Sequence, residues 1–196
     1  MFDALRLKLN SISKIDQDDW MMMEPFFKEK NFKKNEFFLQ AGEIGKHVAF
    51  IVKGSFRWYF INKKGEEMNF HFFLDNGFVV EYQSFISQKP SSMYIQAMED
   101  STIILFPPRD KIFELYGKSH HWSEFGRKVA QLVYVGTADR VQDFLFHSAE
   151  ERYINLLKKY PDIFERVSLS NISSYIGVKG PSLSRIKKRL SKSWPF

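Results

Sequence analysis

Apolar and polar positions follow a strand-like pattern in the middle of this chain and a helix-like pattern at both ends. From Phe32 to Phe106, short aromatic and β-branched runs are separated by turn signals such as Lys53-Gly54 and Asp75-Asn76-Gly77. Strands of this length, spaced about 8–12 residues apart, are typical of an antiparallel sandwich or roll. The runs predict strands over residues 37–39, 48–52, 56–61, 68–74, 94–97 and 102–106.

The flanking segments carry the 3–4 spacing of amphipathic helices. Near the N-terminus, Ser13 or Asp16 would cap a helix over 20–27, which Pro25 interrupts or ends. After the sheet, the spacing predicts helices over 109–116, 119–147 and 150–160. The long helix must bury its apolar stripe, and we expect one face to pack on the β-domain and another on the same helix of a second subunit.

The stretch from Leu169 to Leu190 predicts two short helices separated by a glycine turn. Its apolar positions, which a helix pair would bury, are Ile172, Ile176, Val178, Leu183 and Ile186. Gly177 supplies the positive φ that the turn between the helices needs. The second helix keeps a polar face with Ser182, Arg185, Lys188 and Arg189, side chains suited to phosphates and base edges. This pattern predicts a DNA-binding helix-turn-helix.

Charge is concentrated in the same region. The net charge of +6 lies entirely within residues 149–196, where ten Lys or Arg face four acidic residues, and the first 148 residues are neutral. No acidic residue follows Arg166. Because the basic segment coincides with the helix-turn-helix pattern, nucleic acid is favoured over an ordinary solvated surface.

Composition and motifs exclude several other classes. The chain has 44% hydrophobic residues, which argues against disorder, and no Cys, which excludes disulfides, thiolate metal sites and iron–sulfur clusters. No targeting segment and no run approaching the length of a membrane span is present, so we expect a cytoplasmic protein with no membrane partner. Phosphate loops, nucleophile elbows and His-Glu metal motifs are also absent, and we expect no enzyme activity and no cofactor.

The order of these elements resembles the Crp/Fnr family of bacterial transcription regulators. The best-matched pieces are Gly42-Glu43 and the segments 50–54, 152–157, 167–178 and 183–188. The resemblance implies an α+β fold with an N-terminal antiparallel β-roll (a double-stranded β-helix, as in cyclic nucleotide-binding domains) over 1–117. It further implies a long dimerisation helix over 118–148 and a helix-turn-helix DNA-binding domain over 149–196. Such a homodimer would place its recognition helices in successive major grooves about 34 Å apart.

One departure concerns the effector pocket. Relatives that bind cyclic AMP use a Gly-Glu pair and a downstream Arg-Ser or Arg-Thr, where this chain has Val80-Glu81 and Ser91-Ser92. A buried phosphate without its arginine would be costly, and Lys89 lacks the bidentate fork. We therefore expect no response to cyclic AMP, and Glu81, Ser91 and Ser92 are candidates for an altered effector pocket. For Glu81 the alternative is a solvated carboxylate at a strand end.

The recognition helix also differs from the usual pattern of the family. Pro181 stands where the family commonly has a glutamate, so we expect a different operator preference, while Arg185 keeps the base-reading arginine. We expect Lys179 and Ser182 either to contact phosphates of the DNA backbone or to make no contact with DNA. Six residues follow Leu190, fewer than the family's two-stranded wing needs, which leaves phosphate contacts to Lys187, Lys188, Arg189 and Lys192.

Metal binding finds no support in the sequence. The neighbouring His120 and His121 diverge by about 100° on a helix and do not chelate one ion well. His47 and His71 fall in predicted strands without partners at metal spacing. Aromatic residues such as Phe70, Phe72, Phe73, Phe78 and Phe85 could shape an apolar effector cavity, but a packed roll explains them more simply.

The sequence therefore predicts a dimeric, sequence-specific regulator that binds double-stranded DNA, with an effector of unknown identity and RNA polymerase as a further partner left open. One alternative keeps the roll as a small-molecule-binding module with a degenerate DNA-binding domain. Two others are a cupin-like metal enzyme, and constitutive DNA binding without any effector.

Overall fold

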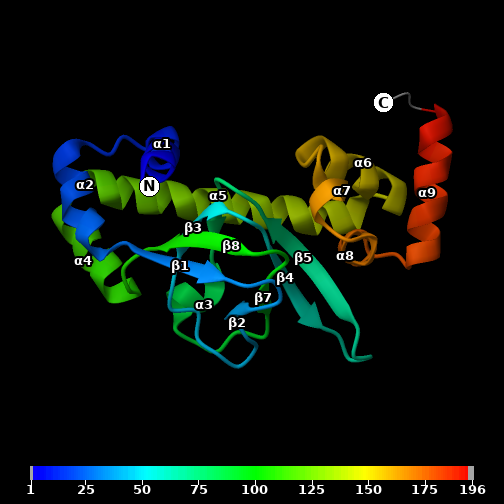
Figure 1. Cartoon of the computed structure of the whole chain (residues 1–196), viewed down its shortest axis with the longest axis horizontal. Coiled ribbons are helices and arrows are strands. Elements are labelled where there is room, and N and C mark those ends of the chain that lie inside the picture. Colours follow the sequence, from blue (N-terminus) through cyan, green and yellow to red (C-terminus); the bar gives the residue numbers. More distant parts are fainter. Residues whose placement is uncertain (1, 194–196) are drawn as a thin grey trace. The chain divides into compact units, whose positions relative to one another are not determined.

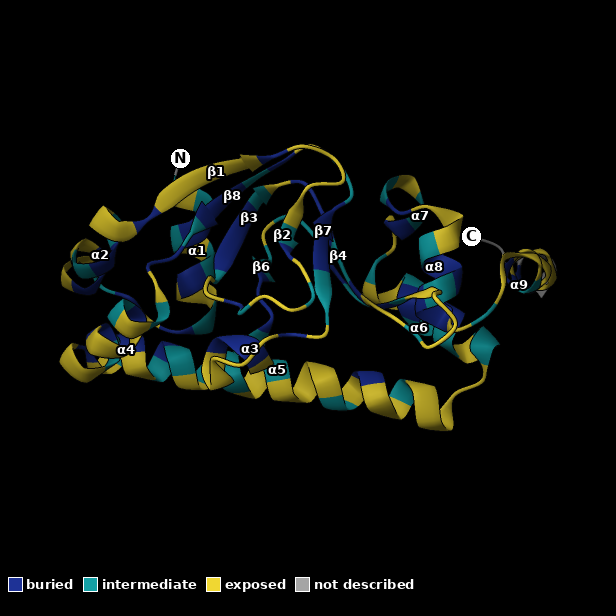
Figure 2. Cartoon of the chain, turned by 90° about the horizontal axis from the view of Figure 1, so that it is seen from below, coloured by how far each residue is buried: buried dark blue, intermediate teal, exposed yellow. Residues whose placement is uncertain are grey.

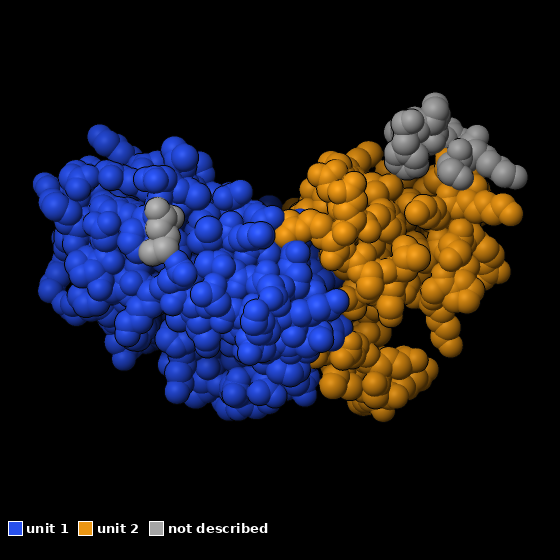
Figure 3. Space-filling view, viewed as in Figure 1, with its two compact units in different colours: residues 1–58, 72–136 blue, residues 59–71, 137–196 orange. Residues whose placement is uncertain are grey.

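A computed structural model of the chain describes residues 2–193, and the side chains of residues 2–190. Lys192, expected to contact phosphate, therefore has a side chain outside the described residues. The chain divides into two compact units (Figure 3): Met1–Trp58 with Phe72–Gly136, and Tyr59–His71 with Thr137–Phe196. The second unit thus includes the end of a hairpin from the middle of the chain. The domain boundaries expected after residues 117 and 148 stay predictions.

The β-rich part contains two four-stranded antiparallel sheets, visible in Figure 1. Their strand orders are β1-β8-β3-β6 and β2-β7-β4-β5. The strands are β1 (Lys28–Phe32), β2 (Phe37–Leu39), β3 (Ala49–Lys53), β4 (Phe56–Ile61), β5 (Glu67–Phe73), β6 (Phe78–Val79), β7 (Tyr94–Ala97) and β8 (Ser101–Leu105). The predicted antiparallel roll is confirmed, with every predicted strand found within one residue of its expected bounds.

The sequence pattern did not predict the strands β1 and β6. β1 is charged along most of its length and exposed up to Phe32, so it shows no apolar alternation. It lies at a sheet edge and pairs only with β8, from Lys28 opposite Leu105 to Phe32 opposite Ser101. Charged edge strands are common because they discourage pairing with other molecules. β6 spans two residues, too few for any period to show.

The first unit has two apolar clusters. One lies inside the roll and includes Phe32, Ile51, Phe56 and Ile95. The other joins the sheet to the helices around it and includes Leu5, Trp20, Phe50 and Trp122. Phe72 and Phe85 are almost completely buried, so packing accounts for much of the aromatic content, as expected.

Short helices border the roll. They are α1 (Asp3–Ile12), α2 (Gln17–Met23) with the 3-10 turn η1 (Glu24–Phe26), α3 (Tyr82–Ser87) and α4 (Arg109–Lys118). Asp16 caps α2, accepting a hydrogen bond from the Asp19 N–H at 2.9 Å, as one of the two predicted caps. Pro25 lies in the 3-10 turn that follows, where the helix was expected to end.

The long helix α5 (His120–Phe146) matches the predicted 119–147 closely. Trp122 and Phe125 are buried in the first unit as expected. Leu132, assigned to the same stripe, is instead 58% exposed.

The second unit is built around α6 (Ala149–Lys159), α7 (Ile163–Arg166), α8 (Leu169–Ile176) and α9 (Gly180–Ser193). Ser148 and Glu151 form a reciprocal capping box that begins α6. The buried side chains of this part of the unit are Tyr153 and Leu156 of α6, Ile163 of α7, and Val167 after it. None of the described helices is both long and apolar enough to cross a membrane.

Candidate nucleic-acid interface

The helix-turn-helix is formed by α8 and α9. Ser168 caps α8 by accepting from the Asn171 N–H at 3.2 Å, and Gly177 ends it with a φ of +78°. The predicted apolar positions Ile172, Ile176, Leu183 and Ile186 are buried, whereas Val178 in the turn is only half-buried. The periodicity therefore identified the contact between the two helices correctly, and the polar face of α9 follows from it.

That polar face lies on the outside of the unit, where Figure 2 shows α9 in end view, largely coloured as exposed. Arg185 is exposed, and its Nη2 donates to the Ser182 hydroxyl at 3.1 Å, so two predicted contact residues lie together. Lys179 is exposed directly before the helix begins, and its carbonyl accepts from the Ser182 N–H. Arg185, Ser182 and Lys179 thus share the N-terminal end of α9.

The remaining predicted residues lie further along α9 and differ in their surroundings. Lys188 is exposed. Arg189 forms an ion pair with Glu150 at the start of α6. The Lys187 ammonium lies 5.0 Å from the centre of the Phe164 ring. Arg189 and Lys187 therefore already have partners within the unit, while Arg185 bonds only to its own helix among the described contacts.

A buried arginine that no sequence pattern identifies connects α8 to the long helix. Arg140 of α5 is 5% exposed, and its guanidinium lies 3.5 Å from the centre of the Tyr175 ring and 4.4 Å from that of Phe144. It donates to the carbonyls of Tyr175 at 2.5 Å, Phe70 at 3.0 Å and Asn69 at 3.3 Å. The Arg140 guanidinium therefore connects three segments of the second unit, namely α5, α8 and the strand β5.

The end of the β4–β5 hairpin also bonds directly to α8. The Asn69 N–H donates to the Ser174 hydroxyl at 2.9 Å, and that hydroxyl donates to the Glu67 carbonyl at 2.6 Å. Nearby, burial and the charges of Lys159 and Arg140 lower the pKa of His71 to about 3, so this imidazole is neutral at pH 7. The hairpin is consequently a structural part of the helix-turn-helix unit.

In the roll, two of the three candidate effector residues, Glu81 and Ser91, are buried and hydrogen-bonded. Glu81 is buried, caps α3 by accepting from the Ser84 N–H at 2.6 Å, and also bonds to Ser91; burial raises its pKa. Ser91 is buried, and its backbone bonds to Gly42 and Glu43. Ser92 is exposed. Hydroxyl and backbone groups, rather than a cation, therefore satisfy the Glu81 carboxylate.

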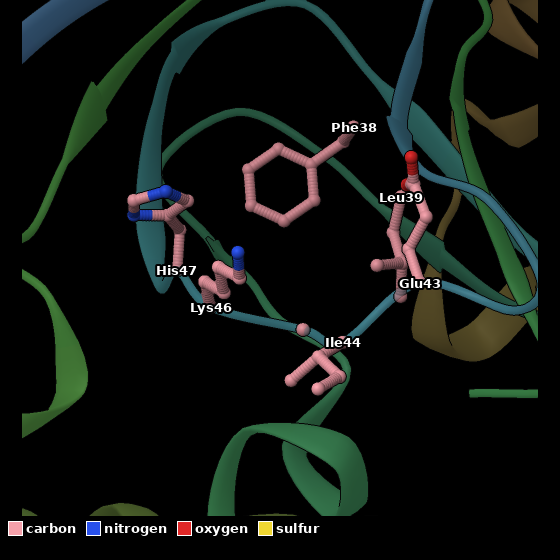
Figure 4. A pocket seen from close by; sticks show the side chains of 7 residues that line it. Phe38, Leu39, Glu43, Ile44, Lys46 and His47 are labelled. Atoms are coloured by element: carbon pink, nitrogen blue, oxygen red, sulfur yellow. The ribbon is translucent and has the colours of Figure 1, made fainter. Parts of the chain in front are cut away.

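A separate hollow of about 410 Å³ lies beside β2 (Figure 4). Its lining residues are Phe38, Leu39, Glu43, Ile44, Gly45, Lys46 and His47. The candidate residues Glu81, Ser91 and Ser92 are not among them. His47, expected in a strand, lies in the loop before β3.

One group of side chains has the composition of a metal site. Ligand atoms of Asp16, Asp19 and His121 lie within 4.8 Å of one another. No motif in the sequence indicates this group, because the histidine and the carboxylates are about one hundred residues apart. Asp19 is buried and accepts from the Ser119 hydroxyl, and His121 Nδ1 lies 2.5 Å from its other oxygen. Hydrogen bonding accounts for this group, and we assign no metal to it.

Comparison with known proteins agrees with the fold. Residues 29–119 match the family model of the cyclic nucleotide-binding domain. No curated protein matches the chain. Among solved structures, FixK2 from Bradyrhizobium japonicum is similar with a TM-score of 0.73 and 18% identity, covering 85% of each chain.

Two further solved structures are similar to this chain. The c-di-GMP responsive global regulator CLP of Xanthomonas campestris has a TM-score of 0.66 and 14% identity, over 86% of this chain and 88% of that one. A putative Crp/Fnr-family transcriptional regulator from Eubacterium rectale has a TM-score of 0.69 and 11% identity, over 91% and 84%. The chain thus has the fold of the Crp/Fnr transcription regulators, with a cyclic nucleotide-binding domain matched over residues 29–119.

Proposed function

We propose that this chain is a sequence-specific, dimeric DNA-binding transcription regulator that acts in the cytoplasm and does not respond to cyclic AMP. The observation that carries the proposal is the exposed Arg185, which stands beside Ser182 on a helix whose opposite face is buried. An arginine in this position on a recognition helix can bond two acceptors of guanine. Lys179 and Lys188 extend the cationic surface toward phosphates.

The long helix supports a homodimer. On its outward side Leu132, Val135 and Leu145 are 58%, 53% and 71% exposed. These residues lie away from the side that carries Trp122 and Arg140. An exposed apolar stripe along a 27-residue helix is typical of a helix that packs against a second copy of itself.

The roll supports the lack of a cyclic AMP response. Ser91 occupies the place of the family's arginine, and its hydroxyl accepts from the Met93 N–H at 3.0 Å. Glu81 is already bonded to Ser84 and Ser91. A cyclic phosphate would therefore lose its hydration without gaining a charged partner. CLP is described as responsive to c-di-GMP, so another effector, or none, is compatible with this fold.

Selection of bound sites from random duplexes, followed by fluorescence anisotropy on the best duplex, tests DNA binding. We expect a two-fold symmetric site and an affinity that falls steeply as salt is raised, because counterions are released from the duplex. Arg185→Ala should weaken binding by about 5- to 150-fold, the equivalent of about 1–3 kcal/mol for one bidentate base contact. Lys158→Ala, which removes an exposed cation from α6, is the matched control and should change affinity little.

Two results would contradict the proposal. Equal affinities for wild type, Arg185→Ala and Lys158→Ala, together with indifference to salt, would remove the role of α9. Calorimetric titration with cyclic AMP should give no heat of binding, and tight binding would contradict the role assigned to Ser91. Binding of a small molecule without any DNA binding would favour the module with a degenerate DNA-binding domain.

A further inference from the structure

The hollow beside β2 has the dimensions and the walls of a small-molecule site. Its volume of about 410 Å³ lies within the range usual for ligand pockets, about 300–1,000 Å³. It is formed by β2 and the loop that precedes β3, and Glu81, Ser91 and Ser92 are not among the residues that line it. It also does not depend on the DNA-binding surface.

The loop that forms the hollow is anchored. Gly45 is buried, and its N–H donates to the Ser84 hydroxyl at 2.8 Å, which ties the loop to α3. The Glu43 carboxylate accepts from the Gln40 N–H at 2.8 Å and closes the turn after β2. Because both ends of the loop are held, the shape of the hollow does not need a ligand to form.

One side of the hollow is apolar. Phe38, Leu39 and Ile44 line it, and the Phe38 ring is supported by Phe32 and Phe56, each with its centre 6.2 Å away. In the view of Figure 4 the Phe38 ring lies between His47 and Leu39, with Lys46 and Ile44 below it. Such a wall can bury the flat or apolar body of a ligand.

The polar part of the lining lies beside the Phe38 ring. Lys46 and His47 line the hollow, and Lys28 and Lys30 of β1 lie close enough to His47 to lower its pKa, after burial as the larger cause. Within the part of the chain that the structure describes, none of these four side chains forms an ion pair. Lys33, by contrast, forms an ion pair with Asp100 at 2.9 Å.

The nearby acids do not pair with these lysines. Glu43 is the acidic residue in the lining, and its carboxylate accepts from the Gln40 N–H and holds the turn. Glu29 lies between Lys28 and Lys30 on β1, and alternation along a strand directs its side chain to the opposite face. Lys28, Lys30 and Lys46 therefore outnumber Glu29 and Glu43, and this small surplus of positive charge beside the Phe38 ring suits a ligand that has both an anionic group and an apolar body.

From this arrangement we propose that the hollow binds an organic anion, with its acidic group held by Lys46 and His47 and its apolar or aromatic body against Phe38. A carboxylate and a phosphate share this chemistry, and the test below separates them. A bound anion would also favour the protonated form of His47.

Fluorescence titration of the full chain with 8-anilinonaphthalene-1-sulfonate tests the site, because this probe joins an aromatic body to an anionic group. We expect saturation at one probe per chain, and about tenfold or greater weakening in Lys46→Glu, because the charge beside the acidic group is reversed. Lys64→Glu makes the same change on an exposed lysine of the β4–β5 turn and should leave the affinity as in wild type. Matching circular dichroism spectra of the three proteins exclude a folding defect.

Displacement of the probe then identifies the acidic group. Phenyl phosphate and benzoate are each added in excess, with benzyl alcohol as the uncharged control. Displacement by either anion but not by the alcohol supports the proposal, and the stronger competitor names the acid. Equal probe affinity in Lys46→Glu and Lys64→Glu, failure of both anions to compete, or equal competition by the alcohol would overturn it.

Discussion

Arg140 is the residue whose surroundings differ most from what its place in the sequence suggests. In the sequence it is one more cation on a long helix, whereas in the structure it is buried between two rings and donates to three carbonyls. Burial lowers its pKa, yet an arginine remains charged at neutral pH. Its removal would leave three acceptors without their donor.

Arg140→Met should lower the free energy of unfolding by about 2–4 kcal/mol, as expected when a buried, hydrogen-bonded charge is lost with its partners left in place. Urea unfolding followed by circular dichroism measures this change. Arg127→Met replaces an exposed arginine of the same helix and should cost no more than about 0.5 kcal/mol. Equal losses in the two variants would show that the Arg140 contacts contribute little.

At the scale of elements, the turn between α8 and α9 is where sequence and structure agree best. Gly177 was expected to adopt a positive φ, and it does so at +78°. A Cβ at this position would also lie 2.9 Å from Cε1 of Phe144. The backbone requirement was visible in the sequence, while the approach of Phe144 from α5 was not.

Gly177→Ala should destabilise the chain by about 1–2 kcal/mol, because the left-handed conformation is unfavourable for alanine and the new methyl group meets Phe144. Thermal unfolding gives this difference. Gly180→Ala is the matched control, since nothing lies within 4 Å of a Cβ there, and it should be neutral or slightly stabilising. A loss of stability confined to Gly180→Ala would contradict the assignment of the turn.

At the scale of the whole molecule, the outward side of α5 determines whether two chains associate. A single chain leaves Leu132, Val135 and Leu145 largely exposed, as the yellow length of α5 in Figure 2 illustrates. Two chains could bury these residues together, and a symmetric pair of recognition helices would follow from that contact.

Val135→Glu should shift the chain from dimer to monomer in sedimentation velocity and weaken binding to a two-fold symmetric duplex, because it places a charge in the proposed contact. Leu7→Glu makes a comparable change at another exposed apolar side chain, 74% exposed on α1, and should leave the dimer intact. A wild-type chain that is monomeric at all accessible concentrations would rule out this dimer.

The sequence by itself determined the helices α4, α5, α6, α8 and α9, most strands and the polar face of α9, because periodicity and turn residues act within short windows. The short helices α1, α3 and α7 were not among the predicted elements. Only the tertiary structure decided what Arg140 contacts, that Arg189 pairs with Glu150 and that His121 meets Asp16 and Asp19. These partners are separated by 35 to more than 100 residues, and such contacts depend on how complete elements pack. The strand β1 belongs with them, since its pairing with β8 rather than any apolar pattern makes it a strand.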